Sequence, residues 1–356
     1  MSDSVLAQIV DSLRTSGPRY FPEHSELRAI RVVGHTPKPD CCTYEIVLDF
    51  ERASERVNAK VYRAGKSASP GSQGLARSEA ENLKFAYQAS VKGKLSGVPR
   101  LVGDFAELGA VVSTKINGLP LQSIIMKAAL LPESADHRLL KTAASQAGDW
   151  LQRFHKATSA TPTALGSCEI LTHMEKLCLK AQEDGLPTES TEAILSNARM
   201  TLSQQKKPVR ASAVLNDFVP LNVLVAQPGV GFSAFANLQQ QASSLHDAAM
   251  FLAAVEALEK YPFCDRSITT PVQEAFVQGY GISEQDKPLL AVLKMRVLLQ
   301  MFAQGRAIQE TAARKKVMWA HVMKRFIQQA VERSMASAAG KNPRFAFRYS
   351  REPGRS

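Results

Sequence analysis

The sequence predicts a two-lobe α+β protein, in which a small antiparallel β lobe precedes a larger, mainly helical lobe. Short runs of β-branched and aromatic residues in strand-like alternation crowd the first third of the chain. Helical periodicity dominates after about residue 121. A chain of 356 residues is also too long for one small core. We therefore expect a β-rich lobe at residues 1–118, an α-rich lobe at 119–335 and a basic, flexible tail at 336–356.

Composition indicates an ordinary folded protein of the cytoplasm. Hydrophobic residues make up 45% and charged residues 22% of the chain, close to the averages for soluble globular proteins. No apolar run approaches the roughly 20 residues that a membrane-spanning helix needs, and the first residues carry no basic leader. The five cysteines are odd in number and lack C-x-x-C spacing, so we expect reduced structural thiols and no transmembrane segment.

The chain is basic, with 44 Lys and Arg against 33 Asp and Glu and a net charge of +11. This favours anionic partners such as nucleotides, phosphorylated sugars, nucleic acid or an acidic membrane surface. Residues 313–334 are basic and amphipathic. We expect this segment to pack against the α lobe, and binding of a protein partner or an anionic surface is the alternative. The tail is favoured as a solvated end over a binding arm. No nucleic-acid-binding motif accompanies the charge, so that function ranks last.

The β lobe is predicted element by element. An amphipathic helix at residues 1–16, ended by Ser16-Gly17-Pro18, is expected to cap the lobe. Residues 28–35, 42–50 and 56–64 then alternate like strands of an antiparallel meander. Helical spacing follows at 75–90, and two further apolar runs follow at 98–105 and 109–118. Five strands with one inserted helix result.

The second lobe begins with strong helical periodicity. One apolar stripe runs through residues 139–158. Strand-like runs at 209–226 and 230–238 interrupt the helical character, which resumes at 245–258 and from 288 to about 335. A β lobe with one helix, followed by a helical lobe interrupted by a short strand pair, is the order of a protein-kinase-like fold.

Phosphoryl transfer needs a Lys at the phosphates, a carboxylate that orients it and a carboxylate that accepts the hydroxyl proton. Lys60 lies in the middle of a half-buried strand, where it needs a counter-charge or an anionic ligand, unless it is an edge Lys that faces water. Glu79, on the following helix, is placed to meet it. Glu81 is the competing partner, and either Glu could be a solvated helix charge.

Asp217 and Asn222 lie five residues apart, just before an apolar strand. Such a loop lets the Asp face a hydroxyl while the Asn amide oxygen reaches a metal ion at the phosphates. The alternative is an Asx turn followed by a turn Asn. The upstream order of elements favours the chemical interpretation.

At residues 26–260 the sequence resembles the aminoglycoside phosphotransferase and choline kinase superfamily, the small-molecule branch of the protein-kinase-like fold. The segments that carry the resemblance are VNAKVYRA, SEAENL, VPRLVGDF, VVSTKINGLPL, AGDWLQRFHKAT, LNDFVPLNVLV and SLHDAAMFL. Each is weak alone, and their order and spacing give the resemblance its specificity.

The resemblance implies roles for individual residues. Lys60 would contact the ATP phosphates and pair with Glu79, Asp217 would be the catalytic base, and Asn222 would bind Mg²⁺. The backbone of residues 113–115 (Ser113, Thr114 and Lys115) would meet adenine. Asp247 would support the catalytic loop, and His155 would be a core histidine beneath it. ATP and Mg²⁺ are thus the implied cofactors.

The sequence departs from the superfamily pattern in two places. Leu215-Asn216 stands where His-Gly usually precedes the catalytic Asp. Ala234 stands where a second metal-binding Asp is expected, and an alanine cannot bind a cation. Asn237 is the nearest polar residue, but a register that uses it would displace Phe235. A glycine-rich phosphate loop is also missing, with Gly34 alone.

Two functions follow as expectations. The first is an ATP-dependent phosphotransferase, of reduced activity, that acts on the hydroxyl of a small-molecule acceptor such as a sugar or glycolipid precursor. The second is a pseudokinase that keeps the fold and acts as a nucleotide- or partner-binding module. Ala234 is the residue that separates them, because loss of a comparable electrostatic contributor costs other enzymes about 10²–10³ in rate.

Overall fold

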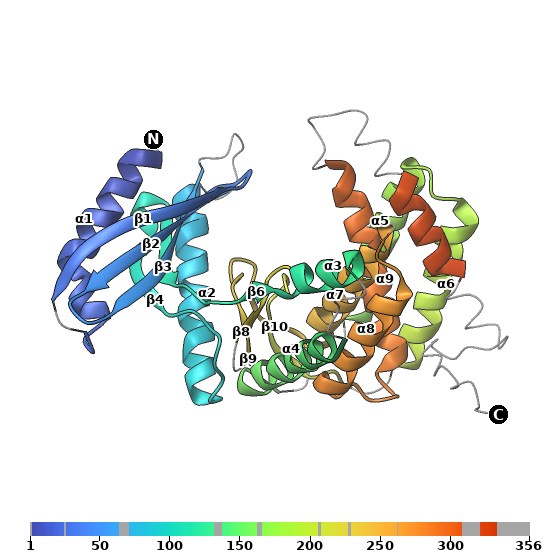
Figure 1. Ribbon diagram of the computed structural model, residues 1–356. Helices are drawn as coiled ribbons and strands as arrows, with labels where there is room; N and C mark the ends of the chain where they lie inside the picture. The colour runs from blue at the N-terminus through green and yellow to red at the C-terminus, as the bar shows by residue number, and fades with distance from the viewer. Residues whose placement is uncertain are drawn as a thin grey trace, which may run out of the picture.

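The computed structural model describes residues 2–24, 26–63, 71–131, 137–161, 166–205, 208–226, 229–261, 263–307 and 321–332. Two lobes lie side by side, a small β lobe and a larger helical lobe (Figure 1). The predicted α+β two-lobe fold is confirmed. None of the described helices is long and apolar enough to cross a membrane.

The β lobe is one antiparallel sheet of five strands between two helices. The strand order is β1-β2-β3-β5-β4, with all pairs antiparallel. The elements are α1 (Ser2–Tyr20), β1 (Leu27–Pro37), β2 (Cys41–Phe50), β3 (Ser54–Tyr62), α2 (Ser72–Lys92), β4 (Leu101–Phe105), the short helix η1 (Ala106–Leu108) and β5 (Ala110–Thr114). The predicted meander, inserted helix and two further strands are therefore present.

Side-chain alternation explains the two helices on the sheet. Neighbouring residues of a strand point to opposite faces, so Val112 joins the core beneath α1, whereas Val111 joins the core shared with α2. Ile9 and Leu13 are the fully buried residues of α1 on its side. Figure 1 shows α1 and α2 on either side of the sheet.

The predicted end of the first helix is wrong. Helix α1 continues past Ser16-Gly17-Pro18 to Tyr20, with Pro18 inside it. A proline inside a helix loses its own amide hydrogen bond and crowds the carbonyl one turn back, but it leaves the hydrogen bonds of the following residues in place. The amide of Phe21 still donates to the Gly17 carbonyl at 3.1 Å, and the buried Phe21 ring anchors the last turn in the core.

The helical lobe contains the two short strand groups that carry the candidate site. Its helices are α3 (Leu121–Leu130), α4 (His137–Ala157), α5 (Ser167–Glu183), α6 (Thr188–Gln204), α7 (Leu245–Glu256), η3 (Ala257–Lys260), α8 (Arg266–Tyr280) and α9 (Lys287–Ala307), and residues 321–332 are also helical. Its strands are β6 (Leu119–Pro120), β7 (Ala211–Val214), β8 (Val223–Ala226), β9 (Gly229–Phe232) and β10 (Gln239–Ser243). They pair as β6-β8-β9 and β10-β7.

Strand β10 of this lobe carries no strand signal in the sequence. β10 has the sequence QQQAS and is mostly exposed, so it shows no apolar alternation; pairing with the buried strand β7 holds it extended.

The helical pattern predicted from 288 to about 335 corresponds to α9 and the helix 321–332. Part of the basic segment 313–334 and the whole tail 336–356 lie outside the described residues.

Close backbone contact fastens the β hairpin of the helical lobe to the segment after α2. The Phe232 amide donates to the Gly97 carbonyl at 2.9 Å. A Cβ at Gly97 would lie 2.4 Å from the Val230 carbonyl oxygen, and Gly97 has a φ of +80° that favours glycine. Nearby, the Trp150 indole donates to the Ser96 carbonyl at 2.7 Å. These contacts fix the position of β9, and the candidate site lies at its end.

Candidate active site

The first part of the site is an ion pair in the β lobe. Lys60 Nζ, on β3, lies 3.0 Å from Glu79 Oε2 on α2. The Tyr62 hydroxyl donates to the same carboxylate at 2.5 Å. Burial and the Glu79 charge raise the pKa of Tyr62, so its hydroxyl stays protonated and keeps donating. The structure thus places Glu79 against Lys60, whereas Glu81 is exposed.

A second lysine comes from the turn between β1 and β2, where the sequence lacks a glycine-rich loop. The Lys38 amide donates to the Cys41 carbonyl at 2.8 Å, which closes the turn, and Lys38 itself lies between Pro37 and Pro39. The charges of Lys60 and Lys38 both act to lower the pKa of Asp217. The charge of Lys38 therefore acts on the second part of the site, which contains Asp217. Gly34 lies in open surroundings, where a Cβ would meet nothing.

The second part of the site is the loop between β7 and β8. The Asn222 side-chain amide donates to the Asp217 carbonyl at 2.9 Å, and the Val219 amide donates to the same oxygen at 2.8 Å. Phe218 is buried and stacks on Trp150 with 5.9 Å between ring centroids. The buried Phe218 ring and the two amides that bond the Asp217 carbonyl fix the backbone of the loop. The Asp217 side chain is therefore held at the edge of the core.

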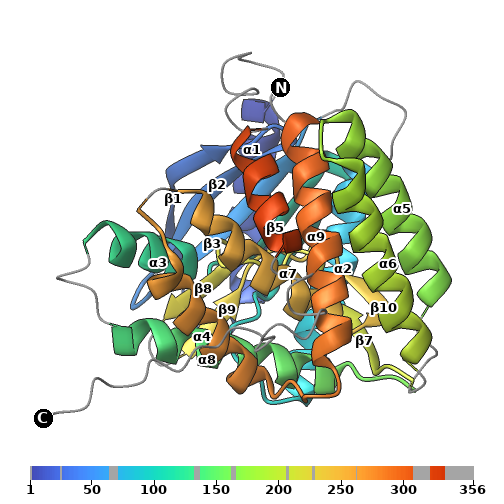
Figure 2. The same cartoon turned by 90° about the vertical axis from the view of Figure 1, so that its right-hand side faces the viewer.

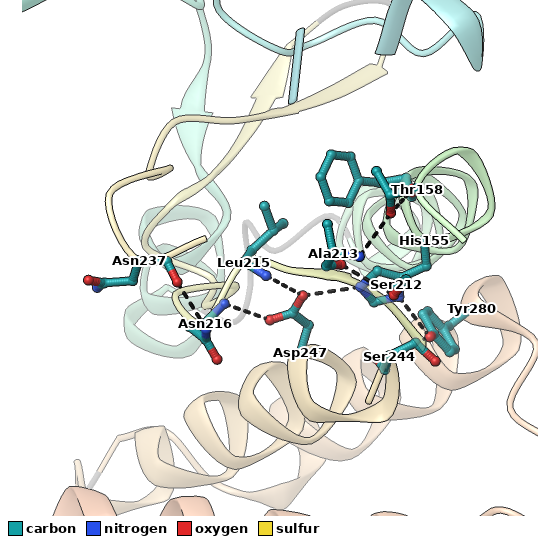
Figure 3. Close-up of polar contacts among 11 residues, drawn as sticks. His155, Thr158, Ser212, Ala213, Leu215, Asn216, Asn237, Ser244, Asp247 and Tyr280 are labelled. Atoms are coloured by element: carbon teal, nitrogen blue, oxygen red, sulfur yellow. Dashed lines mark hydrogen bonds and ion pairs between the residues drawn. The ribbon is translucent and has the colours of Figure 1, made fainter. Parts of the chain in front are cut away.

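Asp247 anchors this loop from below (Figure 3). It is completely buried, and its carboxylate accepts the Leu215 amide at 2.8 Å and the Asn216 amide at 2.9 Å. His155 Nε2 lies 3.1 Å from the same carboxylate, and His155 Nδ1 lies 2.9 Å from the Tyr280 hydroxyl. The expected positions of Asp247 and His155 beneath the loop agree with this arrangement.

The backbone of Asn216 explains one departure from the superfamily pattern. Asn216 has a φ of +58°, in the left-handed region that glycine adopts freely and that Asn tolerates best among other residues. Its side-chain amide also donates to the Asn237 carbonyl at 2.9 Å. Asn216 can therefore replace a glycine before Asp217 while tying the loop to the segment after β9.

The segment after β9 brings a side chain other than that of residue 234 to Asp217. Ala234 is half-buried and packs against the core, and Phe235 is buried. Asn82 of α2 donates to the Phe235 carbonyl at 3.1 Å. Three residues after Ala234, Asn237 Nδ2 donates to Asp217 Oδ2 at 2.7 Å. The residue whose side chain meets Asp217 is therefore Asn237, which the sequence interpretation had set aside.

The side chains around Asp217 offer few oxygen ligands for a magnesium ion. Asn222 donates from its amide nitrogen to the Asp217 carbonyl, which leaves Asn222 Oδ1 as a possible ligand, whereas Asn237 directs its Nδ2 at Asp217 Oδ2. Mg²⁺ prefers carboxylate and phosphate oxygens. Asp217 is the one available carboxylate here in the described part of the chain, because Asp247 lies beneath the loop and already accepts two amides. Within the described ranges, no group of three or more His, Cys, Asp or Glu side chains could hold a metal ion.

The segment predicted to meet adenine is already hydrogen-bonded. The Thr114 amide donates to the Arg100 carbonyl and the Lys115 amide to the Arg56 carbonyl, both at 2.8 Å. Ser113 lies in β5, paired on both sides. A base at residues 113–115 would therefore meet carbonyl oxygens there. The Lys115 side chain pairs with Glu45 at 2.7 Å and lowers the pKa of that carboxyl.

Burial of Asp217 predicts a pH-dependent stability difference. Burial raises the pKa of Asp217, against the opposing effects of Asn237, Lys60 and Lys38. A raised native pKa stabilises the fold below the unfolded pKa of about 3.9, and that stabilisation is lost as pH rises through the native pKa. Asp217→Asn is neutral throughout, so we expect it to melt at a higher temperature than wild type at pH 7. The difference should vanish below about pH 4 in calorimetry; a variant that melts lower at pH 7 would contradict this.

Comparison of structures places the fold. A glucosamine kinase in complex with glucosamine, ADP and inorganic phosphate matches with a TM-score of 0.51 and 12% identity, over 88% of this chain and 96% of that one. The GDP complex of an aminoglycoside 2'-phosphotransferase mutant matches with a TM-score of 0.52 and 14% identity, over 92% and 99%. No family model and no curated protein matches the sequence.

The chain therefore has the protein-kinase-like fold in the form found in small-molecule kinases. This confirms the fold expected from the order of the elements. At these identities the likeness concerns the fold alone. The roles of Lys60, Glu79, Asp217 and Asn222 remain predictions that rest on the geometry described above.

Sequence reasoning missed several side chains of the site. Tyr62 of β3 and Asn82 of α2 contact it, and the charge of Lys38, in the turn after β1, acts on Asp217. The signal for Tyr62 was available, since it lies two residues after Lys60 and so points from the same face of the strand. Asn82 lies three residues after Glu79, on the same side of the helix. Lys38 and Asn237 belong to irregular segments, whose side-chain directions no periodicity predicts.

Proposed function

We propose that the protein is a phosphotransferase of small molecules, which binds a nucleoside triphosphate between the lobes and orients an acceptor hydroxyl at Asp217. The observation that carries this proposal is the Lys60–Glu79 ion pair at 3.0 Å. Asp217 lies close enough to Lys60 for the lysine charge to act on the pKa of the Asp217 carboxyl. A half-buried lysine held by a carboxylate is pre-oriented for a phosphate oxygen. Similar structures include a glucosamine kinase and an aminoglycoside phosphotransferase, which supports a small hydroxyl-bearing acceptor.

The chain's own residues supply three functions. Lys60 and Lys38 neutralise negative charge on the phosphates, and Glu79 with Tyr62 keeps Lys60 in place. Asp217 accepts the proton of the acceptor hydroxyl as the oxygen attacks, and its raised pKa makes it a better base than an exposed Asp. The Asn237 amide holds the Asp217 carboxylate in one orientation.

Asn237 and Ala234 also favour a second candidate, a pseudokinase that binds nucleotide or a partner without turnover. Among the residues that the structure describes, no second carboxylate accompanies Asp217 where a metal ion would be expected, and Asp217 Oδ2 accepts an amide. Retention of the Lys60–Glu79 pair is compatible with nucleotide binding in either case. The two candidates differ in whether Asp217 is needed for a chemical step.

A turnover assay separates them. Purified protein is incubated with ATP and a panel of amino sugars, sugars and glycolipid precursors, and ADP formation is measured alongside ³¹P spectra of the products. We expect slow acceptor-dependent ADP formation that falls at least about 10²-fold in Asp217→Asn. Because that variant should fold more stably than wild type, its loss of activity cannot come from unfolding. Equal ADP formation in both proteins would reject Asp217 as the base.

A further inference from the structure

A half-buried arginine in the helical lobe lies outside the site described above. Arg296, on α9, donates from Nη2 to His246 Nδ1 at 2.7 Å, and its buried Nε has no hydrogen-bond partner among the described residues. His246 is in the first turn of α7 and His173 is on α5. Helix α9 packs against both helices, and Figure 2 shows α5 beside it.

This cluster lacks the carboxylate that accompanies comparable cations elsewhere in the chain. Lys60 pairs with Glu79, and Lys294, two residues before Arg296, pairs with Glu256 at 2.5 Å. No ion pair links Arg296 to a carboxylate in the described part of the chain. Burial alone acts on its pKa, which it lowers. A buried guanidinium without a counter-charge is costly unless a ligand supplies one.

The two histidines add hydrogen-bond donors. Because a guanidinium can only donate, His246 Nδ1 accepts and the ring proton lies on Nε2. Burial, followed by the Arg296 charge, lowers the pKa of His246 to about 4. The same two causes, in the same order, lower the pKa of His173, with Lys176 adding to them. Asp247 acts in the opposite direction on His246, but its oxygens are engaged by the catalytic loop.

We propose that Arg296, His246 and His173 form a binding site for an anionic group, a phosphate or carboxylate, carried by the acceptor. The N-terminal turn of α7 adds its positive end to the three side chains. His246 immediately precedes Asp247, which holds the loop of Asp217, so the anion site and the anchor of that loop share the first turn of α7. The assignment to the acceptor rests on the proposed function; the anion site itself does not.

Inorganic phosphate is the first probe, measured by calorimetric titration and thermal unfolding. We expect phosphate to bind wild type and Lys60→Met with the same affinity. Equal affinity would exclude the nucleotide site at Lys60 as the place where phosphate binds. Arg296→Gln should weaken binding about 10- to 100-fold, since a hydrogen bond to a charged group contributes about that factor. Arg296→Lys, which keeps the charge, should recover part of it. Arg266→Gln, a matched loss of charge at an exposed Arg on α8, should bind as wild type does.

The outcomes are distinct. Phosphate binding that survives Arg296→Gln, or that is lost only in Lys60→Met, overturns the anion site, as does absence of phosphate binding in wild type. Nucleotide binding is measured on the same proteins. Absence of nucleotide binding, together with phosphate binding that depends on Arg296, would reject the proposed function and support the anion site.

The second arm identifies the source of the anion. Turnover with sugar phosphates and sugar acids is compared with turnover on the parent neutral sugars. We expect KM for the acidic acceptors to rise at least about 10-fold in Arg296→Gln, with kcat and the neutral acceptors unchanged. Equal effects on acidic and neutral acceptors would overturn the assignment of the anion to the acceptor and leave free phosphate as the ligand.

Discussion

Replacement of Asp247 by Ala is expected to lower the free energy of unfolding by about 3–5 kcal/mol, the cost of removing one partner from a buried charged network. The carboxylate is completely buried and accepts the Leu215 and Asn216 amides, with His155 at 3.1 Å. Ala would leave two buried amides without acceptors and would open a cavity. Urea unfolding followed by fluorescence measures the loss.

Two further variants control this prediction. Asp265→Ala removes an exposed carboxylate that accepts the Ser267 amide at the start of α8, and such a cap contributes about 0.5–2 kcal/mol. Asp247→Asn keeps one acceptor oxygen but turns an amide group toward a backbone donor, so it should lie between wild type and Asp247→Ala. An Asp247→Ala protein as stable as Asp265→Ala would show that the loop does not depend on this anchor.

The second large effect concerns Asn237→Asp, which should create a cation site. Asn237 Nδ2 lies 2.7 Å from Asp217 Oδ2, so Asp at 237 would place two carboxylates in contact. Like charges at this distance either share a proton or bind a cation. We expect the variant to melt lower than wild type without metal ions, and to be raised by Mg²⁺ by several degrees where wild type is not. Its turnover in Mg²⁺ should rise about 10²-fold, the size of a comparable electrostatic contribution.

Ala234→Asp is the comparison that tests the register. The superfamily pattern puts the missing carboxylate at Ala234, whereas the geometry puts the side chain that meets Asp217 at Asn237. If Ala234→Asp gains Mg²⁺ dependence and Asn237→Asp does not, the observed contact of Asn237 with Asp217 has no bearing on cation binding. Asn237→Gln serves as the control for a change of side chain without a change of charge.

The regular elements were predictable because their residues repeat. β2 and β3 alternate, and the α4 stripe buries Trp150, Leu151 and Phe154, so their order along the chain was enough to indicate the fold. The pairing of Lys60 with Glu79 followed from a strand position and a helix position, each with a defined direction. Helix α1 ran past its predicted end because burial of Phe21 outweighs the local effect of Pro18.

The irregular parts of the site were not predictable in the same way. Asn216 has a positive φ, in the left-handed region. The residues that follow it form neither a helix nor a strand, so their side chains do not repeat at a fixed spacing. Residues 233–238 follow hydrogen bonds from Asn82 and Asn216, which come from distant parts of the chain. Spacing alone points to Ala234 as the position of the missing carboxylate, whereas the contact of Asn237 with Asp217 depends on these tertiary hydrogen bonds and could not be predicted from spacing.

Titration of ATP into wild type and Lys60→Met, with and without Mg²⁺, tests the central claim most directly. We expect ATP to bind wild type by calorimetry, with little change when Mg²⁺ is removed, because the lysines and not a carboxylate pair meet the phosphates. Lys60→Met should bind at least about 10-fold more weakly, the loss of one charged hydrogen bond. Absence of ATP binding to wild type, or equal binding to Lys60→Met, would contradict a nucleotide site at Lys60.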